Sequence, residues 1–201
     1  MISTSTAVID ANVFFGARLT SLVLFLAQTK VFRARWTEKI NDEWVRSVHE
    51  KQKIPLEKLE MRRSYINQSV LDCLVLDYET LEGSFNLPDS EDEHVLAAAV
   101  RTRADVIVTL NLGDFPSAIM SPLGIEAKHP DDFLLNLFGV SPEVFIEAVK
   151  QDFEHYKAPP LTFEQYVEDL RKAGVPGTAQ KIEELKILID LANSGSKQHL
   201  R

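Results

Sequence analysis

The sequence of 201 residues predicts an α/β protein with a parallel central sheet, followed by a small all-helical C-terminal extension. Two uninterrupted apolar runs, 6–9 and 104–110, are typical of strands buried in a parallel sheet, and helical patterns follow the first run and precede the second. From residue 139 onward the patterns are helical only, in a stretch too short to bury its own apolar faces. We therefore expect an α/β domain at 1–138 and an extension at 139–201 that docks on this domain or on a partner.

The first elements are a strand and two helices. The run 6–9 predicts a strand that ends at Asp10, and residues 19–28 are apolar nearly all round, which predicts a helix buried on several sides. Thr37 is a good N-cap for a second helix, because apolar residues repeat every four positions behind it. These residues are Ile40, Trp44 and Val48.

The segment after this second helix is mixed in character. Residues 51–69 are expected to be helical, with Pro55 near the start, and residues 70–76 favour a short strand. The pattern sharpens at Ser90, which forms a capping box with Glu93 three residues later. A strong helix is therefore expected over the string HVLAAAVRTRA, directly before the second apolar run.

The remaining elements are an edge strand and the helices of the extension. Residues 125–128 favour the edge strand, and the string HPDDFLLNLFG predicts a short helix that ends at Gly139. Ser141, followed by proline, opens the next helix as its N-cap. Further helices are expected behind a capping box that starts at Thr162 and over residues 175–192.

Charge is unevenly distributed along the chain. Lys and Arg total 22 against 30 for Asp and Glu, and the net charge of −8 has the wrong sign for a protein that coats nucleic acid electrostatically. Residues 30–63 nevertheless carry ten basic and six acidic side chains, whereas residues 72–93 carry eight acidic ones and no Lys or Arg. An anionic partner must therefore be held locally.

Cysteine content and hydropathy bear on the compartment. Cys73 is the single cysteine, which excludes an internal disulfide framework and suggests a reducing compartment, so we expect a cytoplasmic protein. No secretory signal and no apolar run of the roughly 20 residues that span a bilayer is present near the N-terminus, and no membrane partner is expected.

Three aspartates are expected at one edge of the sheet. Asp10 ends the first strand and Asp114 follows the second apolar run, and the carboxyl ends of parallel strands form the edge where ligands bind. Asp92 opens the helix before that run, which places it at the same edge. Each residue also has a purely structural explanation, because acids favour helix N-termini and aspartate favours turns.

A fourth carboxylate comes from the second helix. At 100° per residue, Glu43 lies about 60° from Ile40, on the border of the apolar stripe, whereas Asp42 lies about 160° away on the solvent side. Glu43 is therefore the acid that can face inward, although an ordinary glutamate at the border explains the periodicity equally well.

Such a group of carboxylates points to a hard divalent cation. The acids would repel one another and raise their pKa values unless a cation neutralised them, and oxygen ligands suit Mg²⁺ or Mn²⁺. The five histidines are scattered and form no zinc pattern. Mg²⁺ can polarise a phosphodiester and lower the pKa of a bound water, which indicates metal-dependent phosphodiester hydrolysis.

Four strings of the sequence together resemble the PIN-domain ribonucleases, in particular the VapC-type toxins of bacterial toxin–antitoxin systems. These strings are VIDANVFF, INDEWVRSV, LPDSEDEHVLAAAV and ADVIVTLNLGDFP. The last two are the specific ones, with an acid two residues before HVLAAA and then a strand that runs into T-x-N-x-x-D-F-P. The resemblance covers about residues 5–138, and HPDDFL with its helical tail is similar to a subgroup with a C-terminal helical extension.

The resemblance implies a PIN-like three-layer α/β/α sandwich, an RNA substrate, a homodimer and inhibition by a small cognate antitoxin of the VapB kind. It also implies a set of catalytic acids that hold Mg²⁺, for which Mn²⁺ can substitute: Asp10, Glu43, Asp92 and Asp114. Asn12 and Asn111 are implied as supporting polar residues beside them.

The basic region suggests where RNA binds. Arg33 and Arg35 alternate with Phe32 and Trp36, a composition that can hold phosphates and stack a base, so we take the two arginines as candidate RNA contacts. The loop NVFFGARLTSL lacks the proline and the Arg-Asp pair of the closest VapC subgroup, so its docking on substrate or antitoxin is expected to differ.

Two other functional classes share part of these features. The first is a catalytically inactive PIN-fold scaffold that binds RNA or protein, which need not bind metal. The second is a haloacid-dehalogenase-like phosphohydrolase, which needs a second aspartate two positions after the first. Asn12 occupies that position, and we set this class aside.

Overall fold

The computed structural model describes residues 4–156, 160–187 and 189. Its centre is a four-stranded sheet of β1 (Thr6–Ile9), β2 (Arg33–Arg35), β3 (Val106–Val108) and β4 (Glu126–Lys128), in the order β2-β1-β3-β4. All three strand pairs are parallel, as in the pairing of Val8 with Ile107. The α/β class and the parallel sheet predicted from the sequence are confirmed.

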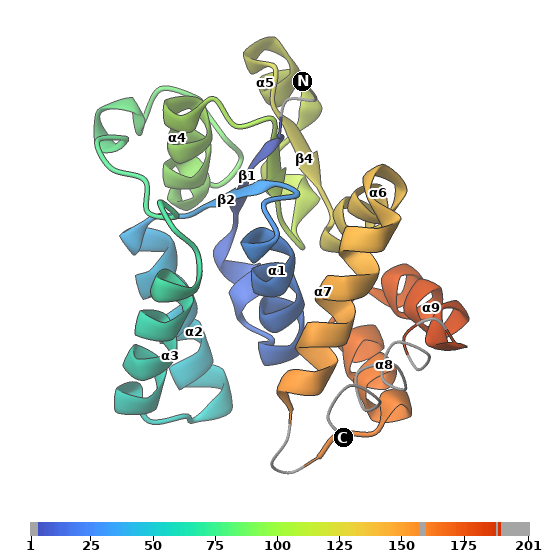
Figure 1. Cartoon of the computed structure of the whole chain (residues 1–201). Coiled ribbons are helices and arrows are strands. Elements are labelled where there is room, and N and C mark those ends of the chain that lie inside the picture. Colours follow the sequence, from blue (N-terminus) through green and yellow to red (C-terminus); the bar gives the residue numbers. More distant parts are fainter. Residues whose placement is uncertain (1–3, 157–159, 188, 190–201) are drawn as a thin grey trace.

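Helices cover the sheet on both faces. The helices of the first part are α1 (Ala17–Gln28), α2 (Glu38–Gln52), α3 (Leu56–Ser69), α4 (Glu93–Thr102) and α5 (Ser117–Met120). In Figure 1, β1 and β2 run between α4 and α1. The helix α4 packs on β1 and β3, and the buried side chains of α1 join the same core from the other side. The three-layer arrangement follows from the apolar strands, which need cover on both faces.

The C-terminal helices are α6 (Pro130–Val140), α7 (Pro142–His155), α8 (Phe163–Lys172) and α9 (Pro176–Glu184). The helix α7 packs along α1, while α9 contacts both α6 and α8, so the extension docks on the α/β part of the same chain (Figure 1). One hydrophobic core runs through both parts, from Ala7 to Ile189. The division at residue 138 therefore stays a prediction.

A buried polar cluster fastens the extension to α1. The Asp152 carboxylate is fully buried and accepts hydrogen bonds from Ser21 of α1 and, at 2.7 Å, from the Tyr166 hydroxyl of α8. Arg18 of α1 lies 3.8 Å from the centre of the Tyr156 ring. Burial is the main cause that raises the pKa of Asp152, and the hydrogen bond from Ser21 opposes it. The cluster joins three helices from both parts of the chain.

One predicted strand is absent, and one strand of the structure was not predicted. Residues 70–76 form no strand; only Leu74 bridges Trp36, with hydrogen bonds from Trp36 N to Cys73 O and from Val75 N to Trp36 O. The left-handed φ of +57° at Asp72 interrupts the extended chain. The strand β2 was not anticipated, because its three residues alternate basic, alanine and basic and carry no apolar run.

Some helix N-caps lie where the sequence predicts them, and others do not. The capping box at Thr162 is confirmed, and Ser141 and Thr37 occupy N-cap positions as expected. At Ser90 the prediction was wrong, because the carboxylate of Asp89 accepts the hydrogen bond from the helix start instead.

Two further helix ends also differ from the prediction. Gly139 lies inside α6, which ends one residue later at Val140. The helix expected over 175–192 ends at Glu184 with a turn at Leu185, and residues 190–192 lie outside the described part of the chain.

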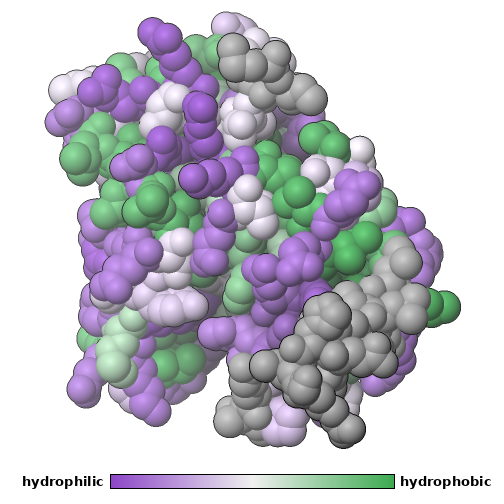
Figure 2. All heavy atoms as spheres, viewed as in Figure 1, coloured by the Kyte–Doolittle hydropathy of each residue, from purple (hydrophilic) through white to green (hydrophobic). Residues whose placement is uncertain are grey.

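The surface is mixed in polarity. Figure 2 shows hydrophilic and hydrophobic side chains interspersed over the visible face. Among the described residues no helix combines the length and apolarity needed to cross a bilayer. Cys73 is buried, and burial raises the pKa of its thiol to about 11.

Candidate active site

Six polar residues singled out from the sequence line one open cleft of about 740 Å³, called the acidic cleft below. They come from the end of β1, from α2, from the start of α4 and from the loop after β3: Asp10, Asn12, Glu43, Asp92, Asn111 and Asp114. The carboxyl ends of β1 and β3 are adjacent in the sheet, which brings the first and last of these segments together.

Asp10 is the most tightly held of the acids. It is only 4% exposed, and its carboxylate accepts hydrogen bonds from Ala11 N at 2.6 Å, Asn12 Nδ2 at 2.5 Å and Thr109 Oγ1 at 2.7 Å. Burial, with a smaller contribution from the charge of Glu43, raises the pKa of Asp10 to about 6, while the Thr109 hydroxyl opposes the shift. The Asp10 carboxylate is therefore held in one orientation and is shielded from solvent.

Asn12 and Thr109 connect the two strand ends. Asn12 donates to Thr109 Oγ1 at 2.9 Å and accepts from the backbone N–H of Leu110 at 2.9 Å. Thr109 Oγ1 in turn accepts from Asn111 N at 3.0 Å. These bonds hold the loop after β3 against Asp10, as supporting hydrogen bonds do around metal ligands.

Asp92 and Asp114 face each other across the cleft. The Asp92 carboxyl lies within hydrogen-bonding reach of Asp114, and Asn111 Nδ2 donates to the Asp114 carboxylate. Burial and then the negative charges of Asp10 and Asp114 raise the pKa of Asp92 to about 7. The carboxylates therefore repel one another, and a proton partly relieves that repulsion when no cation is bound.

Glu43 has a partner that the sequence analysis missed. His94 of α4 is 2% exposed, and its Nε2 lies 3.5 Å from the Glu43 carboxylate. The other ring nitrogen, Nδ1, is buried without a hydrogen-bond partner among the described residues. The only available signal was the position of His94 two residues after Asp92, within the string HVLAAA. The pair links α2 to α4 across the cleft.

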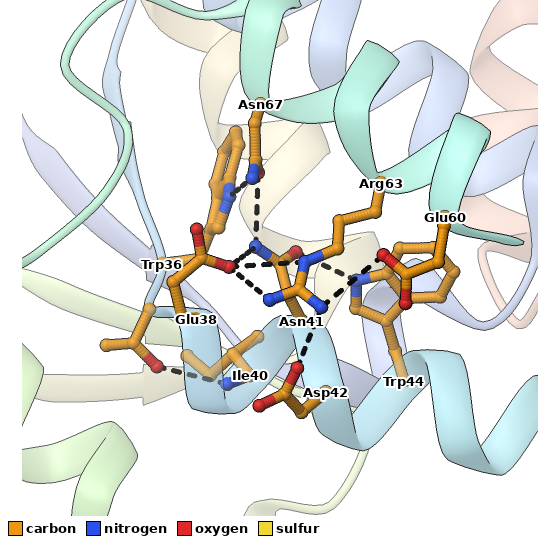
Figure 3. A network of polar contacts seen from close by, with 10 residues as sticks. Trp36, Glu38, Ile40, Asn41, Asp42, Trp44, Glu60, Arg63 and Asn67 are labelled. Carbon is orange, nitrogen blue, oxygen red and sulfur yellow. Dashed lines mark hydrogen bonds and ion pairs between the residues drawn. The ribbon is translucent and has the colours of Figure 1, made fainter.

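A polar network between α2 and α3 holds the helix that carries Glu43 (Figure 3). The amide of Asn41 is fully buried, accepts from Trp44 Nε1 at 3.0 Å and donates to Asn67 at 3.1 Å. Trp36 Nε1 also donates to Asn67, at 2.8 Å.

Ion pairs extend this network on the surface. Arg63 of α3 pairs with Glu38 at 2.5 Å and with Asp42 at 2.8 Å.

Basic side chains lie at the acidic cleft and away from it. Lys39 and Arg46 of α2 line the cleft; Lys39 pairs with Glu82 at 2.7 Å, and Arg46 makes no ion pair with any described residue. Arg33 and Arg35 line two other hollows, of about 460 and 380 Å³, beside β2. The structure therefore does not bring Arg33 and Arg35 together with the acids.

The residues of the cleft fit a divalent cation by their chemistry. Four carboxylates can supply oxygen ligands, and burial together with the negative charge of neighbouring acids raises the pKa values of Asp10 and Asp92, a charge that a cation would offset. In the described part of the chain, no three His, Cys, Asp or Glu side chains already surround one point as ligands. Asp10 is hydrogen-bonded to Asn12 and Thr109, and Asp114 is hydrogen-bonded to Asn111.

Comparisons with known proteins agree with the fold. The PIN domain family matches residues 6–113, and the VapC50 C-terminal domain family matches residues 130–184. A relative named "Putative ribonuclease VapC50", from Mycobacterium tuberculosis (strain ATCC 25618 / H37Rv), is 42% identical over 95 residues. That match spans 47% of this chain and 56% of the relative. No solved structure matches the chain significantly. Residues 130–184 are similar to VapC50 C-terminal domains, and the chain belongs to the PIN-domain family.

Proposed function

We propose that this protein is a divalent-cation-dependent ribonuclease that hydrolyses RNA phosphodiester bonds, and that it is the toxin of a toxin–antitoxin pair. The observation that carries the proposal is the convergence of Asp10, Glu43, Asp92 and Asp114 from four separate segments in one cleft. The PIN-domain family and the name of the mycobacterial relative support the same activity.

The side chains of the cleft have separate tasks in this proposal. Asp10, Glu43, Asp92 and Asp114 hold Mg²⁺, or Mn²⁺ in its place, which when bound polarises the phosphodiester and lowers the pKa of a water molecule. Thr109 and Asn12 orient the Asp10 carboxylate through their hydrogen bonds. Asn111 orients Asp114, and His94 faces Glu43. Arg46 is free to contact a phosphate of the bound strand.

The experiment that tests this function is cleavage of single-stranded RNA by the purified chain with Mg²⁺ or with EDTA. Asp92→Asn removes one negative ligand while it keeps the shape of the side chain. Cleavage is expected with Mg²⁺ and lost both with EDTA and in the variant, whose folding is checked by circular dichroism. Cleavage retained by the purified variant would overturn the assignment of Asp92.

The alternative function is a catalytically inactive PIN-fold scaffold. Its supporting observation is that the carboxylates bond to neighbouring side chains and do not yet surround a common point in the described residues. Isothermal titration with Mn²⁺ separates the two functions. A nuclease binds the ion, and amide variants of the acids weaken binding, whereas a scaffold need not bind the ion at all.

Partners follow from the family and are proposals for this chain. We expect a small VapB-like antitoxin that suppresses the toxicity of the expressed protein, a homodimer, and action in the cytoplasm. Co-expression with any small protein encoded directly beside this one, followed by size-exclusion chromatography, tests the first two. Arg33→Ala combined with Arg35→Ala tests whether RNA also passes the edge of β2; weaker binding supports this path, and unchanged binding rejects it.

A further inference from the structure

A second hollow adjoins the acidic cleft at the side of α2 and the loop after β1. It has a volume of about 290 Å³ and shares the lining residues Asn12, Glu43 and Ser47 with the acidic cleft, so the two hollows lie side by side. Its own walls include Phe15, Leu110 and Lys51. A strand that crosses the acidic cleft can therefore extend directly into this hollow.

One face of α2 leads from the cleft into the hollow. Glu43, Ser47 and Lys51 are spaced four residues apart, so they lie in one row along the helix. Each step advances about 6 Å along the helix axis, a distance comparable with the span of one nucleotide. The row offers a carboxylate at the cleft, then a hydroxyl, then an ammonium group. The Ser47 hydroxyl makes no hydrogen bond to any described residue, so it is available to a ligand.

The ring of Phe15 is positioned to stack. It packs against the hydrophobic core but stays partly exposed, and the Lys51 ammonium lies over the ring at 5.6 Å from its centre. Leu110, which is 38% exposed, adds a second apolar side chain to the wall of the hollow. Lys51 is exposed and forms no ion pair with a described residue, so it can leave the ring for a phosphate.

We propose that this hollow is a nucleobase subsite, which holds one base of the RNA next to the phosphodiester in the acidic cleft. The proposal rests on the proposed ribonuclease function. A base has the flat apolar face that Phe15 accepts and polar edges that Ser47 can hydrogen-bond, and Lys51 matches the charge of the following phosphate. Base stacking of this kind tolerates several bases, so only a modest sequence preference is expected.

The test compares two short fluorescein-labelled RNAs of equal length and charge, one of uridines and one of abasic residues. Binding to the whole chain is measured by fluorescence anisotropy, with Ca²⁺ in place of Mg²⁺ to limit turnover. The uridine strand is expected to bind about tenfold more tightly than the abasic strand. Phe15→Leu, which keeps the apolar contact but removes the flat ring, is expected to abolish this difference and to leave abasic binding unchanged.

Phe138→Leu is the matched control, because Lys181 lies over the Phe138 ring at the same distance of 5.6 Å, away from both hollows. Ser47→Leu places a larger side chain in the hollow and is also expected to abolish the difference between the two strands. It gives a second test if Phe15→Leu lowers the melting temperature too far for binding to be measured. Equal binding of both strands by the wild type, or an unchanged preference in both variants, would overturn the subsite. A preference for the uridine strand without any RNA cleavage would contradict the proposed ribonuclease function but not the nucleobase subsite. RNA cleavage without a preference for the uridine strand would contradict the subsite but not the ribonuclease function.

Discussion

At the scale of single residues, the carboxylates of the acidic cleft lie close to one another and are partly or fully buried, which disfavours their charged forms. Burial and mutual repulsion raise the pKa of Asp10 to about 6 and that of Asp92 to about 7. Without a cation, the folded chain therefore holds protons that the unfolded chain would release. A function that needs these carboxylates close together costs stability at neutral pH, and a bound cation restores it.

This repulsion predicts how Asp92→Asn changes stability with pH. A raised carboxyl pKa contributes stability that is present below about pH 4 and lost as the pH rises through about pH 7. In EDTA, the variant and the wild type should melt at similar temperatures near pH 4, and the variant should melt higher at about pH 8. Thermal unfolding followed by circular dichroism measures both values.

Asp132→Asn is the control for this experiment, because Asp132 is an exposed aspartate of α6 outside the cleft. It should show no comparable change with pH. A difference in melting temperature between wild type and Asp92→Asn that stays constant from about pH 4 to about pH 8 would contradict the raised pKa of Asp92.

At the scale of elements, the site depends on helices that lie far from the acids in sequence. Glu43 faces the cleft because α3 holds α2 through the buried amide of Asn41 and its bonds to Trp44 and Asn67. Periodicity alone placed Glu43 at the border of the apolar stripe. Periodicity could not predict the network between α2 and α3 or the pairing of Glu43 with His94, because both join residues that only the tertiary fold brings together.

The network between α2 and α3 predicts a large effect for Asn41→Ala. The substitution leaves the buried N–H of Trp44 without its acceptor, which should lower the free energy of unfolding by about 1–3 kcal/mol. Urea unfolding measures the loss. Gln68→Ala, which removes an exposed hydrogen bond to Ser64 on α3, should change stability by no more than about 0.5 kcal/mol. Equal effects of the two substitutions would show that the buried amide does not hold α2.

The anchor of the extension gives a second element-scale prediction. Tyr166→Phe removes the hydroxyl that donates to the buried Asp152 carboxylate and should cost about 1–3 kcal/mol in urea unfolding. RNA cleavage should persist at temperatures where the variant is folded, because neither residue lines the acidic cleft. Tyr65→Phe, at an exposed position of α3, is the control. Loss of cleavage in the folded Tyr166→Phe protein would assign the extension a direct part in the reaction.

At the scale of the whole molecule, the sequence was informative where its patterns were local. The apolar runs of β1 and β3 and the helix signals fixed the class, and strand ends placed Asp10 and Asp114 at one edge. The strand β2 escaped prediction, because it consists of three residues held between neighbours and has no apolar run of its own. The family resemblance supplied what periodicity left open, above all the role of Asp92.

The fold places part of the net charge of −8 at the acidic cleft. Three of the eight acids in the run 72–93 line the cleft, namely Asp89, Glu91 and Asp92, and Lys39 and Arg46 line it as well. Affinity for bulk RNA should therefore be weak and sensitive to salt, with a few local phosphate contacts.

Arg46→Gln tests these local contacts. Loss of one phosphate contact should weaken binding of single-stranded RNA and reduce the slope of log K against log salt by about 0.7. Fluorescence anisotropy over a range of salt concentrations measures the slope. Lys58→Gln makes the same change of charge on an exposed position of α3 outside the cleft and should leave the slope nearly unchanged. A slope that responds equally to both substitutions would indicate a diffuse effect of net charge.

The central claim is that the four carboxylates form a cation-dependent centre acting on a phosphodiester bond. Cleavage of an RNA with a phosphorothioate at the mapped cleavage position tests it most directly, because sulfur binds Mg²⁺ poorly and Mn²⁺ better. We expect one diastereomer to be cut much more slowly than the unmodified RNA with Mg²⁺, and Mn²⁺ to restore its rate. Cleavage of either diastereomer at the full rate in EDTA would contradict the account.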